Sequence, residues 1–138
     1  MKNLLHVGLD VGSTTVKIAV FDSDFNIVYT NYERHFSDTK NTVCKVLENL
    51  VEKFADSDFT IALTGSGAMS AATFLDLPFI QEVVACKRAV EKYIPRTNVV
   101  IELGGEDAKI IYFGKSIEQR MNGTCAGGTG AFIDQMAS

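Results

Sequence analysis

Alternating apolar and polar positions predict three strands at the start of the chain. The runs Leu4 to Asp10, Thr15 to Asp22 and Asn26 to Tyr32 are rich in β-branched and aromatic residues, and the short stretches "VGST" and "DSDF" separate them. Runs of this kind joined by short turns are typical of antiparallel strands. The sequence therefore opens with a predicted three-strand meander.

After the third predicted strand, the spacing of apolar residues changes to the spacing typical of a helix. Between Asp38 and Phe54, apolar residues recur every three or four positions, which predicts an amphipathic helix with Asp38 or Thr39 as its N-cap. After it we expect a buried strand at 59–64, a turn opening a short helix in "GSGAMSAATF", a candidate edge strand in "LPFI", and a helix from Glu82 to Tyr93. Strands and helices alternate here, as they do in an α/β fold.

A second meander follows. Asn98 to Leu103, Ala108 to Phe113 and Ser116 to Arg120 are predicted strands, and a helix is expected from about Gly128 onward. The order of elements is βββαβαβα, after which the same order begins again. We therefore expect a first lobe at residues 1–97 and the start of a second lobe at 98–138, in a chain that is a fragment of a longer protein.

The two meanders also resemble each other in sequence. When Asp10 in "VGLDVGSTTVKIAVF" is aligned with Glu102 in "VIELGGEDAKIIYF", Gly12 meets Gly104 and Lys17 meets Lys109, at an offset of 92 residues. Any strand–glycine turn–strand hairpin would share the glycine, but the shared acid and lysine are harder to explain by coincidence. We interpret the pattern as an internal repeat.

Composition limits the function. The 138 residues are 46% hydrophobic, which is enough to form one hydrophobic core. Their net charge is −4, so we expect no basic surface that would bind nucleic acid or an anionic membrane. The apolar runs are far shorter than the roughly 20 residues of a membrane span, which favours the cytoplasm. Three cysteines without a CxxC spacing indicate neither a disulfide framework nor an intrachain zinc site.

Each repeated hairpin has the chemistry of a metal and phosphate site. A carboxylate at the end of a buried strand, followed by a glycine turn, can face a ligand while the backbone N–H groups of the turn bind phosphate oxygens. Asp10 and Glu102 are candidate ligands of a hydrated Mg²⁺, which typically takes one or two carboxylates together with nucleotide phosphates. Lys109 is either a phosphate contact or a solvent-facing strand lysine. The candidate phosphate-binding residues of the first hairpin are Gly12, Ser13, Thr14, Thr15 and Lys17, with Lys17 a candidate for a salt bridge as well.

Cys125 lies in a third glycine-rich stretch, "NGTCAGGTGAF", directly before the last predicted helix. The residues alone leave three interpretations open: an inert small side chain, a lone redox thiol, or a ligand of a metal cluster.

Together these motifs resemble a known family. "GLDVGSTTVKIAVFD" and "IELGGEDAKI" resemble the two phosphate loops of the actin, hexokinase and sugar-kinase superfamily. In combination with "NGTCAGGTGAFIDQMA", they resemble the ATP-dependent activators of 2-hydroxyacyl-CoA dehydratases and the related benzoyl-CoA reductase ATPase subunits. The resemblance implies ribonuclease H-like, actin-like ATPase lobes, in which a three-strand antiparallel meander is extended by parallel strands with helices.

The resemblance also implies an activity. It predicts a homodimer that hydrolyses ATP to ADP with Mg²⁺ and passes an electron from ferredoxin or flavodoxin, at low potential, to a dehydratase or related reductase. The electron would pass through one [4Fe–4S] cluster shared between subunits, with Cys125 as a ligand and with Gly127, Gly128 and Gly130 offering N–H groups to the cluster sulfurs.

The second loop departs from the family pattern. Glu102 and Glu106 replace the usual aspartate and glutamine, whereas Asp107 keeps the family's acid and is a candidate for orienting the attacking water. Candidate catalytic residues are thus Asp10, Glu106 and Asp107. The candidate phosphate-binding residues of this loop are Gly104, Gly105 and Lys109.

Some alternatives stay open. A sugar or acetate kinase would use the same phosphate loops, and a regulatory module would keep the fold without turnover. For the turn "LTGSGAMS", a structural role is preferred to an anion-binding role. Cys44 and Cys86 are interpreted as core residues, and His35 as a surface loop residue.

Overall fold

The computed structural model describes residues 3–114, 116–122 and 128–138. The chain forms two compact units, Met1–Ile80 and Gln81–Ser138, and each is described by itself. No helix in the described ranges is both long and apolar enough to cross a membrane.

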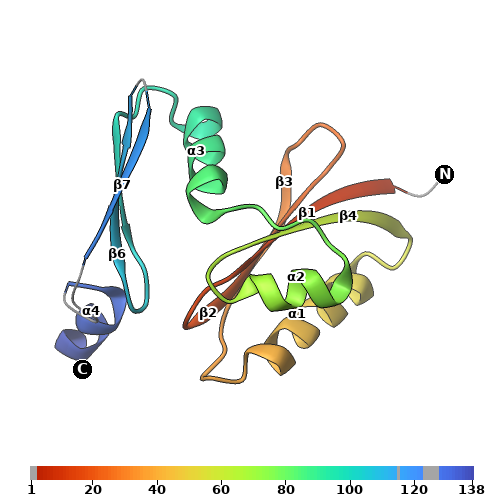
Figure 1. The fold of residues 1–138 in the computed structure, drawn as a ribbon. Coiled ribbons are helices and arrows are strands. Elements are labelled where there is room, and N and C mark those ends of the chain that lie inside the picture. The colour runs from red at the N-terminus through yellow and green to blue at the C-terminus, as the bar shows by residue number, and fades with distance from the viewer. Residues whose placement is uncertain (1–2, 115, 123–127) are drawn as a thin grey trace. The chain divides into compact units, whose positions relative to one another are not determined.

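The first unit is built on a four-stranded mixed sheet with the order β3-β2-β1-β4 (Figure 1). The strands β1 (Asn3–Val11), β2 (Thr15–Phe21) and β3 (Ile27–Arg34) form the predicted antiparallel meander, and β4 (Ser57–Thr64) extends it parallel to β1. A parallel neighbour requires a crossover, which here contains the helix α1 (Thr39–Lys53). The α/β class and the meander extended by a parallel strand are confirmed.

One face of this sheet carries the core of the unit. Alternate residues of β1 point to that face, where they meet buried residues of α1 and of α2 (Ala68–Leu75). Asp38 is the N-cap of α1, and its carboxylate accepts a hydrogen bond from the Asn41 N–H. Each fully buried aliphatic side chain contributes about 1.5–3 kcal/mol of transfer free energy, so this layer holds the two helices against the sheet. The buried core residues of β1, α1 and α2 are Leu5, Val7, Leu9, Val11, Val43, Val46, Leu50, Ala68 and Ala72.

The segment "LPFI" is not a full strand. It makes one isolated parallel bridge, between Leu63 and Phe79, with hydrogen bonds from the Leu63 N–H to the Pro78 carbonyl and from the Ile80 N–H to the Leu63 carbonyl. Pro78 has no N–H to extend the ladder. The expected edge strand is therefore reduced to a bridge.

The second unit contains α3 (Glu82–Tyr93), a meander of β5 (Val99–Leu103), β6 (Ala108–Phe113) and β7 (Ile117–Met121), and α4 (Gly130–Ala137). The sheet order is β5-β6-β7, and both pairings are antiparallel. Helix α3 groups with this meander, although the sequence places it in the first lobe. The lobe boundary after residue 97 stays a prediction.

One expectation about the cysteines is wrong. Cys44 lies on α1 between core positions, yet its side chain is exposed, because it falls one residue past Val43 on the helix and outside the apolar stripe. Cys86 on α3 is only partly buried.

Candidate functional site

The first hairpin brings Asp10 and Lys17 together. The two residues are cross-strand partners of β1 and β2, and the Lys17 Nζ lies 2.8 Å from the Asp10 Oδ2. Three residues, 12–14, separate the strands, and the Gly12 N–H closes the turn on the Thr15 carbonyl at 2.9 Å. Ser13 at the tip is exposed, whereas Thr15 is buried. The structure thus supplies the salt bridge expected of Lys17 and leaves the loop tip open to a ligand.

The second hairpin repeats this geometry. Glu102 and Lys109 are cross-strand partners of β5 and β6, and the Gly104 N–H donates to the Asp107 carbonyl at 2.8 Å. Gly104 and Asp107 are the residues that the sequence repeat aligns with Gly12 and Thr15. Two hairpins with the same cross-strand pair and the same turn-closing bond support an internal repeat.

Lys109 differs from its counterpart because it is buried among carboxylates. Its side chain is 9% exposed, and its Nζ lies 2.7 Å from Glu82 on α3, 3.3 Å from Asp107 and 3.7 Å from Glu102. A solvent-facing Lys109 is therefore excluded. Glu82 was not singled out in the sequence, because no local spacing connects a helix residue with a strand residue 27 positions later.

The charges in this cluster do not balance, since three carboxylates face one ammonium group. Burial, together with the negative charges of Glu82 and Asp107, raises the pKa of Glu102 against the opposing effect of Lys109. Burial alone lowers the pKa of Lys109, but its hydrogen bond to Glu82 and the surrounding carboxylates outweigh burial and raise it. Burial and the charges of Glu102 and Glu82 also raise the pKa of the Cys86 thiol. Cys86 is thus held as a neutral thiol beside the cluster.

The turn "LTGSGAMS" packs against the first hairpin. The Gly67 N–H donates to the Val11 carbonyl at 2.8 Å. Gly65 has a φ of +99°, and a Cβ added there would collide with the Asp10 Oδ1 and the Val11 carbonyl. Only glycine meets both demands. The structural interpretation of this turn is supported, and its structural task is to hold the strand end that carries Asp10.

A second glycine contact holds the second hairpin. The Gly130 N–H at the start of α4 donates to the Gly104 carbonyl at 2.8 Å, and the Ala131 N–H donates to the Gly105 carbonyl at 3.2 Å. The expectation that the Gly130 N–H serves a cluster sulfur is wrong for this conformation, because that group is already engaged. Cys125 and Gly127 lie outside the described residues.

Two polar atoms at the end of β1 and β4 are buried without a hydrogen-bond partner in the described part of the chain: the Asp10 Oδ1 and the Thr64 Oγ1. Asp10 and Thr64 are register partners on neighbouring parallel strands. A buried carboxylate oxygen without a partner is costly, and ligands of α/β sheets bind at the carboxyl ends of the strands. The Asp10 carboxylate therefore fits a hard cation such as Mg²⁺, which prefers oxygen ligands.

His35 is a further residue that sequence reasoning missed. It is 6% exposed, its backbone N–H donates to the Thr14 carbonyl at 3.1 Å, and its Nε2 lies 3.2 Å from the Gly12 carbonyl oxygen. The expectation of a surface loop residue is wrong. No apolar period marks His35 for burial, because its sequence neighbours include Arg34, Ser37 and Asp38.

The remaining candidates are placed as follows. Glu106 is exposed at the tip of the second hairpin, and Asp107 is partly buried beside Lys109. Among the described residues, no group of three or more histidine, cysteine, aspartate or glutamate side chains is arranged to hold a metal ion.

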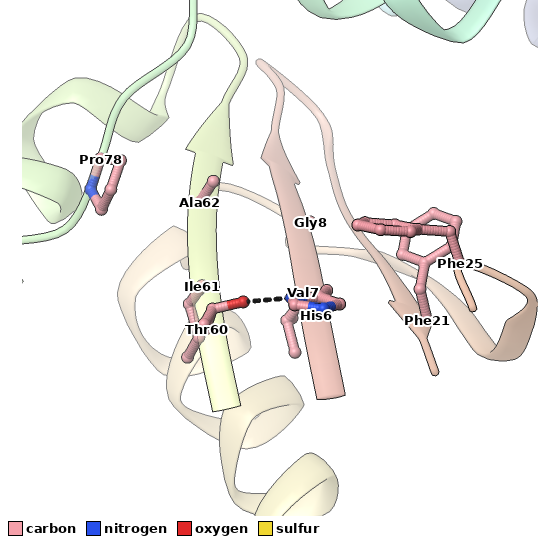
Figure 2. A pocket seen from close by; sticks show the side chains of 9 residues that line it. All are labelled: His6, Val7, Gly8, Phe21, Phe25, Thr60, Ile61, Ala62 and Pro78. Atoms are coloured by element: carbon pink, nitrogen blue, oxygen red, sulfur yellow. Dashed lines mark hydrogen bonds between the residues drawn. The ribbon is translucent and has the colours of Figure 1, made fainter. Parts of the chain in front are cut away.

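An open pocket of about 370 Å³ lies elsewhere on the first sheet, against the face that carries His6, Gly8 and Thr60 (Figure 2). The His6 Nδ1 lies 2.7 Å from the Thr60 Oγ1, and the His6 ring stacks on Phe25 with centroids 4.9 Å apart. The lining is mostly apolar and contains no lysine, arginine or carboxylate. This pocket therefore lacks the groups that a phosphate or Mg²⁺ needs.

Comparison with known proteins connects these hairpins with one family. The model of the BadF/BadG/BcrA/BcrD ATPase family matches residues 7–138. The (R)-2-hydroxyglutaryl-CoA dehydratase activating ATPase of Acidaminococcus fermentans is 33% identical, with 96% of this chain and 52% of that protein covered. The 2-hydroxyisocaproyl-CoA dehydratase activator of Clostridioides difficile is 36% identical, with 95% and 50% covered.

A solved structure agrees with this result. The activator of the 2-hydroxyisocaproyl-CoA dehydratase from Clostridium difficile, with bound ADPNP, superposes with a TM-score of 0.81 and 31% identity, and 96% of this chain and 51% of that chain are covered. The fold is thus that of the actin-like ATPases. The chain spans about half the length of the relatives it matches.

Proposed function

The chain belongs to the BadF/BadG/BcrA/BcrD ATPase family, and from this premise we propose that it carries phosphate-binding loops of an ATP-dependent activator of a 2-hydroxyacyl-CoA dehydratase or a related reductase. The observation that carries the proposal is the repeated hairpin, in which an acid and a lysine pair across two strands and a glycine N–H closes the turn. ATP hydrolysis in this protein drives an electron to the partner enzyme.

The first hairpin binds the phosphates of ATP or ADP. The tip residues Ser13 and Thr14 offer backbone N–H groups and hydroxyls, Gly12 lets the phosphates approach the backbone, and Lys17 supplies a positive charge 2.8 Å from Asp10. In phosphoryl transfer, positioning and charge neutralisation dominate over covalent chemistry. Rigid N–H groups beside one lysine are therefore the contribution that this loop makes.

Asp10 holds Mg²⁺ through the oxygen that Lys17 leaves free. The Asp10 Oδ2 faces Lys17, whereas the Asp10 Oδ1 is buried without a partner in the described residues. When bound, the metal neutralises negative charge on the nucleotide phosphates. That Glu102 is a second Mg²⁺ ligand stays a prediction, as does the role of Thr15, which is buried.

The second hairpin orients the attacking water and binds phosphate oxygens. Asp107 forms an ion pair with Lys109, and Glu106 is exposed. We assign the positioning of water to these two carboxylates. Backbone groups of Gly104 and Gly105 line the same turn.

The electron-transfer part of the proposal rests on the sequence. Cys125 is a ligand of a [4Fe–4S] cluster shared across a homodimer, and ferredoxin or flavodoxin is the electron donor. A kinase of the same superfamily is not favoured, because it has no use for a cysteine in this glycine-rich stretch.

The test uses the intact protein. Asp10→Asn keeps the shape of the side chain and removes its charge, so ATPase activity is expected to disappear while the visible spectrum of an anaerobically reconstituted cluster stays unchanged. Asp56→Asn, which changes an exposed acid before β4, is the control and should retain activity. Unchanged ATPase rates in Asp10→Asn would overturn the metal assignment, and a cluster that survives Cys125→Ser would overturn the activator assignment.

A further inference from the structure

We propose that His35 is a positioning residue for the first phosphate loop, a role that rests on the proposed ATP binding above. His35 follows the last residue of β3 and makes two contacts with the three-residue loop at 12–14. Its backbone N–H donates to the Thr14 carbonyl at 3.1 Å, and its Nε2 lies 3.2 Å from the Gly12 carbonyl oxygen. One residue thus holds both ends of the loop.

The hydrogen-bond network assigns the tautomer of the His35 ring. The Ser37 N–H donates to the Nδ1 at 3.1 Å, so the Nδ1 carries no proton and acts as an acceptor. A neutral imidazole then has its proton on the Nε2, which donates to the Gly12 carbonyl. The Thr39 hydroxyl lies 3.4 Å from the same Nδ1. The side chain is therefore held on one side by the turn and holds the phosphate loop on the other.

The turn that aims the ring adopts unusual backbone conformations. Phe36 and Ser37, directly after His35, have φ angles of +46° and +69°, in the left-handed region where residues other than glycine are disfavoured. Phe36 is 83% exposed, so burial of its side chain does not explain the conformation. Strained residues persist where the surrounding structure holds them, and they cluster at functional sites. Two hydrogen bonds stabilise this turn. The Ser37 N–H donates to the His35 Nδ1 at 3.1 Å, and the Asp38 N–H donates to the His35 carbonyl at 2.7 Å.

The contact matters to a ligand because of peptide geometry. The C=O of Gly12 and the N–H of Ser13 belong to one trans peptide unit and point in opposite directions. Holding the Gly12 carbonyl on the His35 ring therefore directs the Ser13 N–H away from the ring. Ser13 is exposed, so this N–H is oriented for an anionic ligand such as a nucleotide phosphate before the ligand arrives.

The second hairpin supports this interpretation independently. Gly104, the repeat partner of Gly12, also has its carbonyl held, in this case by the Gly130 N–H at 2.8 Å. The two copies use different donors, a histidine ring and a helix N-terminus, for the same task. A task that both copies perform with unrelated residues is a requirement of the loop.

The experiment compares two amides at position 35 of the full-length chain. Glutamine is long enough to place an N–H near the position of the Nε2, whereas asparagine ends near the Nδ1 and cannot reach Gly12. We expect His35→Asn to weaken binding of Mg²⁺–ADP, measured by calorimetry, by about tenfold, which is the equivalent of one hydrogen bond, and His35→Gln to recover most of the affinity. The KM for ATP should follow the same order. His6→Gln, at the other histidine, is the control and should bind as the unchanged protein does.

Hydrogen exchange separates this inference from the proposed function. Without nucleotide, the amide groups of residues 12–15 should exchange faster in His35→Asn than in His35→Gln. If the unchanged protein bound no nucleotide but this order held, the ATP-binding proposal would fail and the positioning role would stand. Equal exchange and equal affinity in the two folded variants would overturn the role of His35.

Discussion

Replacing Lys109 by methionine removes the single positive charge from a cluster of three carboxylates while keeping most of the side-chain volume. The Lys109 Nζ makes one short contact, 2.7 Å to Glu82, and longer ones to Asp107 and Glu102. Removing one partner of a fully buried ion pair costs about 3–5 kcal/mol, because the other charge is left without compensation. The carboxylates here are 33%, 38% and 30% exposed, so water screens part of that repulsion. We therefore expect a loss of about 2–3 kcal/mol.

The assay is urea unfolding at neutral pH, followed by circular dichroism, with hydrogen exchange in β5 and β6 to locate the loss in the second unit. Lys87→Met is the matched control. Lys87 also lies in the second unit, but its ion pair with Glu91 is a surface i,i+4 contact at 3.5 Å, worth a few tenths of a kcal/mol. Acidification should restore part of the stability of Lys109→Met, because protonation removes the repulsion between the carboxylates. A loss no larger than that of Lys87→Met, or a loss that acid does not relieve, would refute this account of the cluster.

Two shorter predictions follow from the same geometry. Because the pKa of Glu102 is raised, the folded chain holds the carboxyl proton of Glu102 more tightly than the unfolded chain does. The second unit should therefore lose stability as the pH rises from the ordinary glutamate range through the raised pKa. Glu102→Gln should weaken this dependence of the urea midpoint on pH, measured across the same pH range. Gly65→Ala places a Cβ against the Asp10 carboxylate at a φ of +99°, and we expect the free energy of unfolding to fall by at least about 1–2 kcal/mol from the left-handed backbone alone. Thermal unfolding measures this loss, and Gly8→Ala, with open space around its Cβ, is the control. Equal stability of the two variants would contradict the packing of Gly65 against Asp10.

The elements and the acid–lysine pairs were predictable because their signals are local. Asp10 and Lys17 are seven residues apart on two strands joined by a short turn, so the hairpin alone brings them together. Asp38 as the N-cap of α1 follows from its place before an apolar period. In each case the residues that decide the structure lie within one turn or one hairpin of each other.

The partners that the sequence did not reveal come from distant segments. Glu82 reaches Lys109 across 27 residues, and His35 reaches Gly12 across 23. Such contacts depend on how a helix or a turn packs on a strand, and neither residue has a spacing that marks it. The prediction that Cys44 is a core residue was wrong because a residue one position from a core residue on a helix points about 100° away from it.

The two copies of the hairpin are expected to respond differently to the same substitution. A Cβ on Gly12 would lie 3.5 Å from the Thr15 carbonyl oxygen, an ordinary contact, whereas a Cβ on Gly104 would lie 2.6 Å from the Asp107 Oδ1 and 3.0 Å from the Asp107 carbonyl oxygen. Gly104→Ala must therefore move the Asp107 side chain and shift the Asp107 carbonyl slightly, at a cost of about 1 kcal/mol, while Gly12→Ala should fold with nearly unchanged stability.

If glycine is present at position 12 to admit a ligand, and not to close the turn, Gly12→Ala should still lose affinity for Mg²⁺–ADP in calorimetry. Stability and binding would then separate at Gly12 and fall together at Gly104. Equal losses of stability in the two variants would show that the turns are equally tight, against the geometry. Full nucleotide affinity in a folded Gly12→Ala would show instead that the phosphates do not approach the backbone of the first hairpin, and the repeat would then be a feature of folding alone.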